Sequence, residues 1–157
     1  PARDIFEHFT AHPESRVWVE CVDSDADAAS HAAALSAPFA NRLHFHRVNA
    51  LRFRPHGRFQ LIWSGGLFDY LSDDLFVRLL RRLWAALAPS GELVVGNFSP
   101  TNPSRTYMEL VGGWVLIHRS ELELTALASR AGVPSEFVRV AAEAEGVNLF
   151  LHLRKGA

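Results

Sequence analysis

The sequence predicts a mixed α/β fold, in which helices cover both faces of a mostly parallel, twisted sheet. Three observations support this class. Short apolar runs alternate with amphipathic stretches along the chain, as in successive βα units. The apolar runs are continuous and rich in β-branched residues, as strands covered on both faces require. The last two runs are separated by only a short turn, which predicts a C-terminal antiparallel hairpin.

Two helices and two strands are expected at the start of the chain. A helix over residues 2–11 would place Ile5, Phe6 and Phe9 on one face. A strand over residues 17–22, an alanine-rich helix over 26–37 and a strand over 43–48 follow. Because all 157 residues fit the size of one domain, residues 1–157 are expected to form a single domain.

A third strand is expected over residues 59–64, before a strongly amphipathic helix. Ser72 is predicted to cap this helix, and the aspartates that follow it lie where the helix dipole favours negative charge. Pro89-Ser90-Gly91 ends the helix, and a buried strand over residues 92–97 comes next.

Residues 99–119 are less regular, with two prolines and a glycine pair, and they are the expected place for an insertion over a pocket. Ser120 and Glu123 predict a capping box, in which the two side chains bond each other's free backbone N–H groups. That helix is expected to end at Gly132. The terminal hairpin would use residues 137–142 and 147–153.

The composition excludes several classes of protein. Hydrophobic residues make up 48% and charged residues 21%, which is typical of a globular domain. A net charge of −1 does not favour a nucleic-acid partner. No apolar run reaches the roughly 18 residues of a membrane span, and the charged opening residues do not resemble a signal peptide. With Cys21 as the single cysteine, we expect a cytoplasmic protein. Because the chain opens on Pro1, we expect it to be part of something longer.

Short polar residues and glycines follow the expected strands, where open parallel sheets bind their ligands. They are Asp23, Ser24, Asn49, Ala50, Ser64, Gly65, Gly66, Asn97, Phe98 and Ser99. An acidic residue after a strand can accept both ribose hydroxyls of a nucleoside, and a glycine pair lets backbone approach a ligand. Simpler interpretations remain open: Asp23 or Asp25 caps the next helix, Gly65-Gly66 is only a turn, and Asn49 is only a loop residue.

The order of these elements, with the closing hairpin, resembles the Rossmann-like fold of class I S-adenosylmethionine-dependent methyltransferases. The run from Pro89 to Val95 is similar to that family's turn into its fifth strand, and Phe59-Gln60-Leu61-Ile62 resembles its fourth strand. The resemblance implies that S-adenosylmethionine is the cofactor. By position, Asp23 would hold its ribose, Asn49 would meet its adenine amino group, and Ser64, Gly65 and Gly66 would line its methionine end. Ser24 and Ala50 are further candidate cofactor contacts.

Several motifs resemble bacterial proteins that make methyl esters of 3-hydroxy fatty acids. They are Pro1-Ala2-Arg3-Asp4, the run from Gly65 to Leu71, Gly96-Asn97-Phe98, Asn102-Pro103-Ser104-Arg105 and the run from Gly146 to Phe150. This resemblance implies methyl transfer to a small-molecule carboxylate or hydroxyl on a fatty-acid-like acceptor. The family's first strand and glycine-rich loop are absent from the chain, so an exposed sheet edge and a homodimer formed through it are expected.

Methyl transfer from a sulfonium needs mainly positioning and desolvation, and it needs a general base only where the acceptor is protonated. Tyr70 and Asn97 follow strands and are candidate catalytic residues, with His118 as the candidate base. Arg105, Tyr107 and Arg119 flank the irregular segment and are candidate substrate ligands, because arginine and tyrosine can orient a carboxylate.

Other interpretations receive less support. His44 and His46 share a strand face but have no evident third ligand, so no metal is expected. An acidic residue after the second strand of the family's fold also suits a nicotinamide cofactor, so an NAD-dependent oxidoreductase is one alternative. A catalytically incompetent interaction module is the other, favoured by Asn49, Gln60 and the missing glycine loop.

Overall fold

A computed structural model describes the backbone of residues 3–157, and the side chains of these residues apart from 3, 4, 29 and 33. The chain divides between Arg54 and Pro55 into two compact units. Each unit is described by itself.

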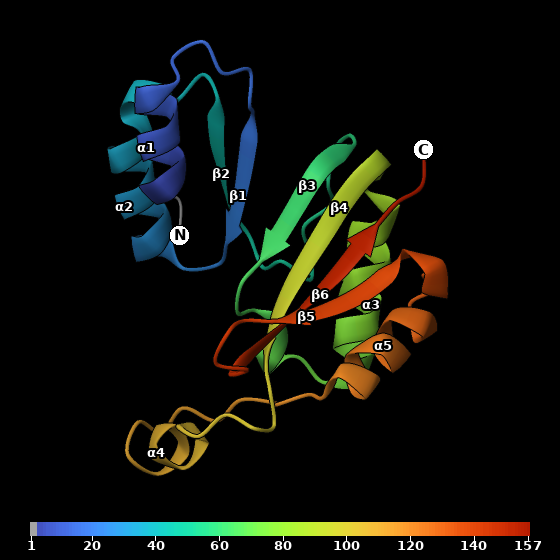
Figure 1. Ribbon diagram of the computed structural model, residues 1–157. Coiled ribbons are helices and arrows are strands. Elements are labelled where there is room, and N and C mark those ends of the chain that lie inside the picture. Colours follow the sequence, from blue (N-terminus) through green and yellow to red (C-terminus); the bar gives the residue numbers. More distant parts are fainter. Residues whose placement is uncertain (1–2) are drawn as a thin grey trace. The chain divides into compact units, whose positions relative to one another are not determined.

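The first unit contains a two-stranded parallel sheet with two helices. Its elements are α1 (Arg3–Ala11), β1 (Val19–Asp23), α2 (Ala26–Ser36), a 3-10 turn (Ala37–Phe39) and β2 (Leu43–Arg47) (Figure 1). Val19 lies opposite Leu43 and Asp23 opposite Arg47, so the carboxyl ends of both strands share one edge. The predicted helices and strands are present with small changes at their ends.

The second unit contains a four-stranded sheet in the order β3-β4-β6-β5. Its elements are β3 (Phe59–Ser64), a 3-10 turn η2 (Phe68–Tyr70), α3 (Asp73–Ala85), β4 (Leu87–Phe98), α4 (Arg105–Leu110), α5 (Glu121–Arg130), a 3-10 turn η3 (Ser135–Phe137), β5 (Val138–Ala142) and β6 (Asn148–Arg154) (Figure 1). β3 and β4 are parallel, whereas β6 is antiparallel to both β4 and β5. The predicted α/β class and the terminal hairpin are confirmed.

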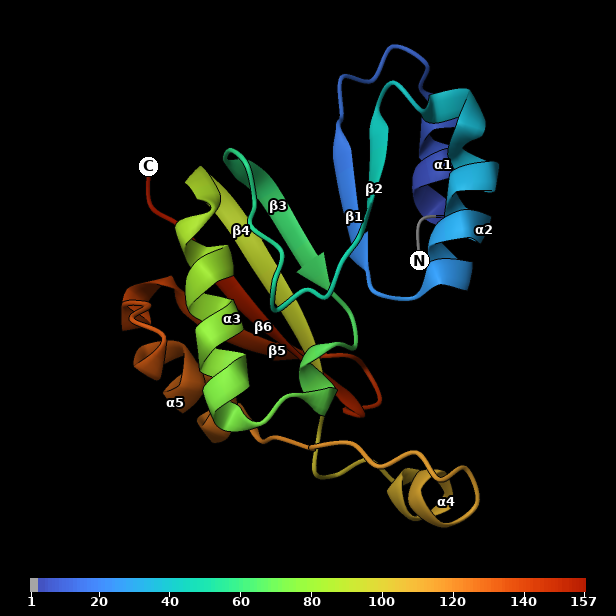
Figure 2. The same ribbon diagram turned by 180° about the vertical axis from the view of Figure 1, so that it is seen from behind.

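The core of the second unit lies between its sheet and the two helices α3 and α5, which cover one face (Figure 2). Alternate residues of β4 and β6 point into it, and Leu93, Val95, Leu151 and Leu153 are fully buried. Burying each such side chain contributes about 1.5–3 kcal/mol. This packing fixes the strands whose ends carry the candidate site.

Two boundaries differ from the sequence prediction. Ser72 occupies the N-cap position of α3, but its side chain makes no cap hydrogen bond. Strand β4 begins at Leu87, before the predicted start, and contains the turn at Ser90, where φ is 60°. A Cβ on the next residue, Gly91, would lie 2.8 Å from the Phe59 carbonyl oxygen, so glycine is required where the two strands approach.

Candidate functional site

The strand ends of the first unit place Asp23 and Asn49 in short turns. The Asp23 Oδ1 atom accepts the N–H of Asp25 at 3.0 Å, and the Asn49 Oδ1 atom accepts the N–H of Leu51 at 2.8 Å. The cap of α2 is Asp25, whose Oδ1 accepts from Asp27 and Ala28. In the part of the chain that the structure describes, the other Asp23 carboxylate oxygen has no hydrogen-bond partner, which leaves it accessible to a ligand.

The two remaining residues predicted for this edge lie beside these turns. Ser24 is exposed directly after β1, and Ala50 is half-buried directly after Asn49. Asp23, Ser24 and Asn49 therefore face solvent at the edge where the carboxyl ends of β1 and β2 lie together.

In the second unit, Gly65 and Gly66 follow β3 and are exposed. The preceding Ser64 pairs with Val95 inside the sheet. A Cβ on Gly96 would lie 2.9 Å from the Gly65 carbonyl oxygen, so β4 and the glycine turn touch through backbone. A Cβ on Gly66 would come no closer than 4.0 Å to its nearest neighbour, the Asp69 carboxylate. The backbone at Gly66 is therefore open to a ligand.

Arg119 is buried and holds several segments together. Its Nε and Nη2 atoms donate to the Asp73 carboxylate, Nη1 donates to the Phe68 carbonyl and to Asn97 Oδ1, and Nη2 also donates to the Leu71 carbonyl. All three guanidinium nitrogens thus have partners within the protein. The prediction that Arg119 binds substrate is therefore corrected, because this side chain has no donor left to offer.

Asn97 belongs to the same buried network. Its Nδ2 atom donates to the Phe98 carbonyl at 3.1 Å and to the Ile117 carbonyl at 2.9 Å, and its Oδ1 accepts from Arg119. These bonds tie the returning end of residues 99–119 to β4. The prediction of a catalytic role for Asn97 is corrected for the same reason, since the amide is enclosed and already bonded.

Asp69 is the member of this network that the sequence analysis did not select. Its carboxylate accepts the Phe98 N–H at 2.8 Å, and its backbone carbonyl accepts the Ile117 N–H at 2.8 Å. Burial raises the pKa of Asp69, while the Phe98 N–H, His118 and Arg119 oppose that rise. An acidic residue inside the apolar run Leu67-Phe68-Asp69-Tyr70-Leu71 is the sequence signal that could have found it.

His118 is half-buried, and both of its ring nitrogens have neighbours. Nδ1 lies 3.1 Å from the Leu116 carbonyl and Nε2 lies 3.3 Å from the Asn102 amide nitrogen. A neutral imidazole protonated on Nδ1 satisfies both contacts, with Nε2 accepting from Asn102. The ring is thus held with its basic nitrogen toward Asn102.

Tyr70 and Trp114 form an exposed pair next to these residues. The Trp114 indole nitrogen donates to the Tyr70 hydroxyl oxygen at 2.6 Å, and the Trp114 ring stands edge-on to Phe98. Because an indole nitrogen can only donate, the Tyr70 oxygen is the acceptor and keeps its own proton. Among the described residues no group accepts that proton, so Tyr70 can donate it to a ligand.

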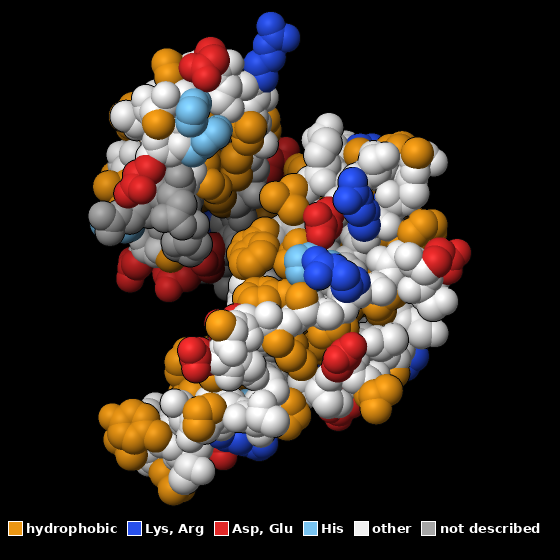
Figure 3. Space-filling view, in the orientation of Figure 1, with side chains coloured by type: hydrophobic (Ala, Val, Ile, Leu, Met, Phe, Trp, Pro, Cys, Tyr) orange, Lys and Arg blue, Asp and Glu red, His pale blue; other side chains and the backbone are white. Residues whose placement is uncertain are grey.

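Arg105 and Tyr107 lie in α4, which stands away from the sheet beyond the ends of β3 and β4 (Figure 1). The Arg105 Nε atom donates to Glu109 at 2.8 Å, and Tyr107 is exposed. Further exposed apolar side chains follow Tyr107 in the same segment, and Figure 3 shows hydrophobic side chains at this end of the unit. They are Leu110, Val111, Trp114, Val115 and Ile117.

The fold is similar to that of several solved structures, two of which are described as methyltransferases. A protein from Bordetella parapertussis, described as a possible exported protein, is 24% identical with a TM-score of 0.74, over 90% of this chain and 54% of its own. The apo S-adenosylmethionine-dependent methyltransferase SibL is 19% identical with a TM-score of 0.72, over 99% of this chain and 48% of its own. The N-methyltransferase NodS from Bradyrhizobium japonicum, in complex with S-adenosylhomocysteine, is 17% identical with a TM-score of 0.63, over 89% of this chain and 67% of its own.

The likeness to the two methyltransferases confirms the predicted resemblance at the level of the fold, which is the Rossmann-like fold of these enzymes. The chain spans about half the length of the first two of these structures. No protein-family model and no curated protein sequence matches the chain. The resemblance to enzymes that make fatty-acid methyl esters stays a prediction. None of the helices that the structure describes is long and apolar enough to cross a bilayer.

Proposed function

We propose that the protein transfers a methyl group from S-adenosylmethionine to an oxygen of a small molecule. The observation that carries this proposal is the likeness of the fold, over nearly the whole chain, to solved methyltransferases. The polar strand ends support it, because they lie where this kind of sheet binds ligands.

The strand ends of the first unit offer the contacts proposed for the nucleoside part of the cofactor. The free oxygen of Asp23 accepts from the ribose hydroxyls, beside Ser24, and the Asn49 amide nitrogen meets the adenine, beside Ala50. For Ser64, Gly65 and Gly66 of the second unit, the assignment to the methionine end is the one that the methyltransferase resemblance implies. The backbone at Gly66 suits that assignment, because a Cβ there would have its nearest described neighbour at 4.0 Å.

Tyr70 is the residue that we place at the acceptor. The transfer is an in-line displacement in which the S–CH₃ bond of the sulfonium breaks as the O–CH₃ bond forms, so the acceptor oxygen must be held in line. The Trp114 indole N–H donates to the Tyr70 hydroxyl oxygen, which leaves the Tyr70 proton free. That proton supplies the hydrogen bond that orients the acceptor oxygen. A carboxylate acceptor needs no base. A hydroxyl acceptor would give its proton to His118 Nε2, which would exchange its present contact with the Asn102 amide for the acceptor.

An apolar acceptor suits the side chains available along residues 99–119. Tyr107, Leu110, Val111 and Val115 are all exposed there, and together they could cover a fatty-acid-like chain. Of the two arginines in this segment, Arg119 is committed to the fold and Arg105 is paired with Glu109. The Arg105 pair is exposed and therefore weak, so Arg105 can turn to a carboxylate at little cost.

Calorimetric titration of S-adenosylhomocysteine tests the cofactor assignment, with NAD as the competing ligand. The titration uses the full-length protein. Asp23→Ala should abolish binding, while Asp27→Ala, which removes an exposed aspartate from α2, should leave it unchanged. Binding of NAD in place of the sulfur nucleoside would overturn the proposal, as would equal affinity in the two variants.

The acceptor is tested with isotope-labelled S-adenosylmethionine and matched pairs of acceptors. We expect transfer to a 3-hydroxy fatty acid to exceed transfer to a short hydroxy acid, because only the former can bury an apolar chain. Methyl ester and methyl ether products distinguish a carboxylate acceptor from a hydroxyl acceptor. Transfer only to amines would contradict the assignment of an oxygen acceptor.

A further inference from the structure

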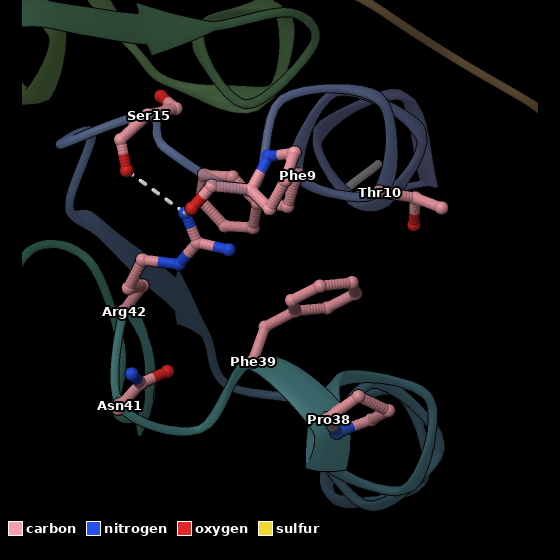
Figure 4. Close-up of a pocket in the computed structure, with 8 residues that line it drawn as sticks. Phe9, Thr10, Ser15, Pro38, Phe39, Asn41 and Arg42 are labelled. Atoms are coloured by element: carbon pink, nitrogen blue, oxygen red, sulfur yellow. Dashed lines mark hydrogen bonds between the residues drawn. The ribbon is translucent and has the colours of Figure 1, made fainter.

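A hollow lies in the first unit, at the end of the sheet opposite to Asp23. Arg42 directly precedes β2, and its carbonyl accepts the N–H of Val19 at the start of β1. The hollow is therefore at the amino ends of the two parallel strands. It has a volume of about 460 Å³ and is lined by Phe9, Thr10, Pro13, Ser15, Pro38, Phe39, Asn41 and Arg42 (Figure 4).

The side chain of Arg42 is anchored on one side only. Its Nη1 atom donates to the Ser15 carbonyl at 2.8 Å and to the Pro13 carbonyl at 3.3 Å. Its Cζ atom lies 4.3 Å from the centre of the Phe9 ring and 5.8 Å from that of Phe39. Among the described residues, Nε and Nη2 have no hydrogen-bond partner. Figure 4 shows a guanidinium nitrogen turned toward the space between the two phenyl rings.

Arg119, whose hydrogen bonds all serve the fold, offers a comparison for Arg42. It is almost completely buried, and all three of its nitrogens donate to protein oxygens. Arg42 is only half-buried and uses one nitrogen. Its position is therefore fixed by Nη1 and the Phe9 ring, while the edge that carries Nε–H and Nη2–H stays available. Two parallel N–H groups on one edge match the two oxygens of a carboxylate.

We propose that this hollow binds a carboxylate carried on a small apolar or aromatic group. The Arg42 edge would bind the two carboxylate oxygens, and the exposed Asn41 amide is a further donor at the rim. Phe39 and Pro38 offer apolar surface to the body of the ligand. The Thr10 hydroxyl already donates to the Phe6 carbonyl, so toward a ligand it can only accept. A single cation with apolar walls favours a monoanion over a phosphate dianion.

Benzoate is the probe that tests this site, because it joins a carboxylate to a flat apolar ring. The readouts, in a nitrogen–proton NMR spectrum of the full chain, are the Arg42 Nε–H signal and the backbone N–H signals of Thr10 and Asn41, which line the hollow. The Thr10 backbone signal also reports binding in the variants. We expect a saturable shift in the millimolar range with benzoate, and little change with benzamide, which has the same shape without the charge. Acetate should bind at least about tenfold more weakly, because it cannot contact the rings.

Two variants separate binding from folding. Arg42→Lys keeps the charge but loses the parallel N–H pair and should weaken benzoate binding about tenfold, whereas Arg47→Lys at the other end of β2 should not. Since Arg42→Lys can also loosen residues 13–15, Asn41→Ala serves as the second variant: it leaves the Arg42 anchors intact and should weaken binding several-fold with an unchanged thermal midpoint. An unsaturable shift, an equal response to benzamide or acetate, or unchanged affinity in both variants would overturn the proposal.

Discussion

Two groups of polar side chains lie close together at the strand ends of the second unit, and they differ in how their hydrogen bonds are used. Asp69, Asn97 and Arg119 are 2%, 1% and 2% exposed and bond to one another's segments. Tyr70 and Trp114 are 59% and 47% exposed and bond to each other. A position after a strand therefore does not by itself make a residue a ligand contact; burial decides which residues hold the fold and which remain available.

The buried group exists because residues 99–119 leave the sheet and return without pairing as a strand. The returning backbone is fixed instead by the Arg119 N–H to the Phe98 carbonyl and by the Ile117 N–H to the Asp69 carbonyl. Trp114 lies within this loop, so its contact with Tyr70 depends on that anchoring. The buried group thus positions the exposed one.

The largest expected effect comes from removing the centre of the buried group. Arg119→Met keeps an apolar stem of similar length but leaves Asn97 Oδ1 and the Phe68 and Leu71 carbonyls without their donor. We expect the free energy of unfolding in urea at pH 7 to fall by about 3 kcal/mol. Arg130→Met removes an exposed pair with Asp74 and should cost less than about 1 kcal/mol. Equal losses in the two variants would mean that burial does not distinguish these arginines.

A smaller effect is expected from the buried carboxylate. Because burial raises the pKa of Asp69 in the folded state, protonation favours the folded form, and this contribution is lost as pH rises through the folded pKa. Asp69→Asn retains an acceptor for the Phe98 N–H but cannot ionise. The stability of the natural protein relative to this variant should therefore fall as pH rises from 3.8, the ordinary pKa of an aspartate, toward neutrality. Urea denaturation of both proteins over that range measures it, and a constant or rising difference would contradict the assignment.

The sequence predicts the elements of this unit well because their signals are local. β3 occupies the predicted residues 59–64, and Ser120 and Glu123 form the predicted capping box. Asn97 and Arg119 were misassigned because their partners are distant in sequence. They bond to each other across 22 residues, and no periodicity or cap signal reports such a contact. The free proton of Tyr70 was likewise not predictable, because it depends on the donor supplied by Trp114.

The capping box lies outside the buried group and offers a local comparison. Ser120→Ala removes the acceptor for the Glu123 N–H and should cost about 1 kcal/mol, whereas Ser129→Ala, near the other end of α5, should cost little. Bonds from the Ser120 side chain and backbone lower the pKa of Glu123. The contribution of this carboxylate to stability is therefore present above the ordinary glutamate pKa of 4.5 and is lost as pH falls through the folded pKa. Thermal denaturation at pH 7 and pH 3.5 measures both effects. If Ser120→Ala destabilised the protein as much at pH 3.5 as at pH 7, the Glu123 carboxylate would make no contribution to the capping box.

The smallest effect on stability, together with a clear effect on activity, is expected from the exposed group. Tyr70→Phe removes a hydroxyl whose one partner among the described residues is Trp114, so the free energy of unfolding should change by no more than about 0.5 kcal/mol. Under the proposed function, the acceptor loses one hydrogen bond of about 1.4 kcal/mol, so kcat/KM for the acceptor should fall about tenfold. Affinity for S-adenosylhomocysteine should not change, and Ser129→Ala, which removes an exposed hydroxyl from α5, is the control. If Tyr70→Phe instead destabilised the protein as much as Arg119→Met does, the Tyr70 hydroxyl would belong with the buried group. The division between the two groups would then fail at the residue on which the proposed acceptor site depends.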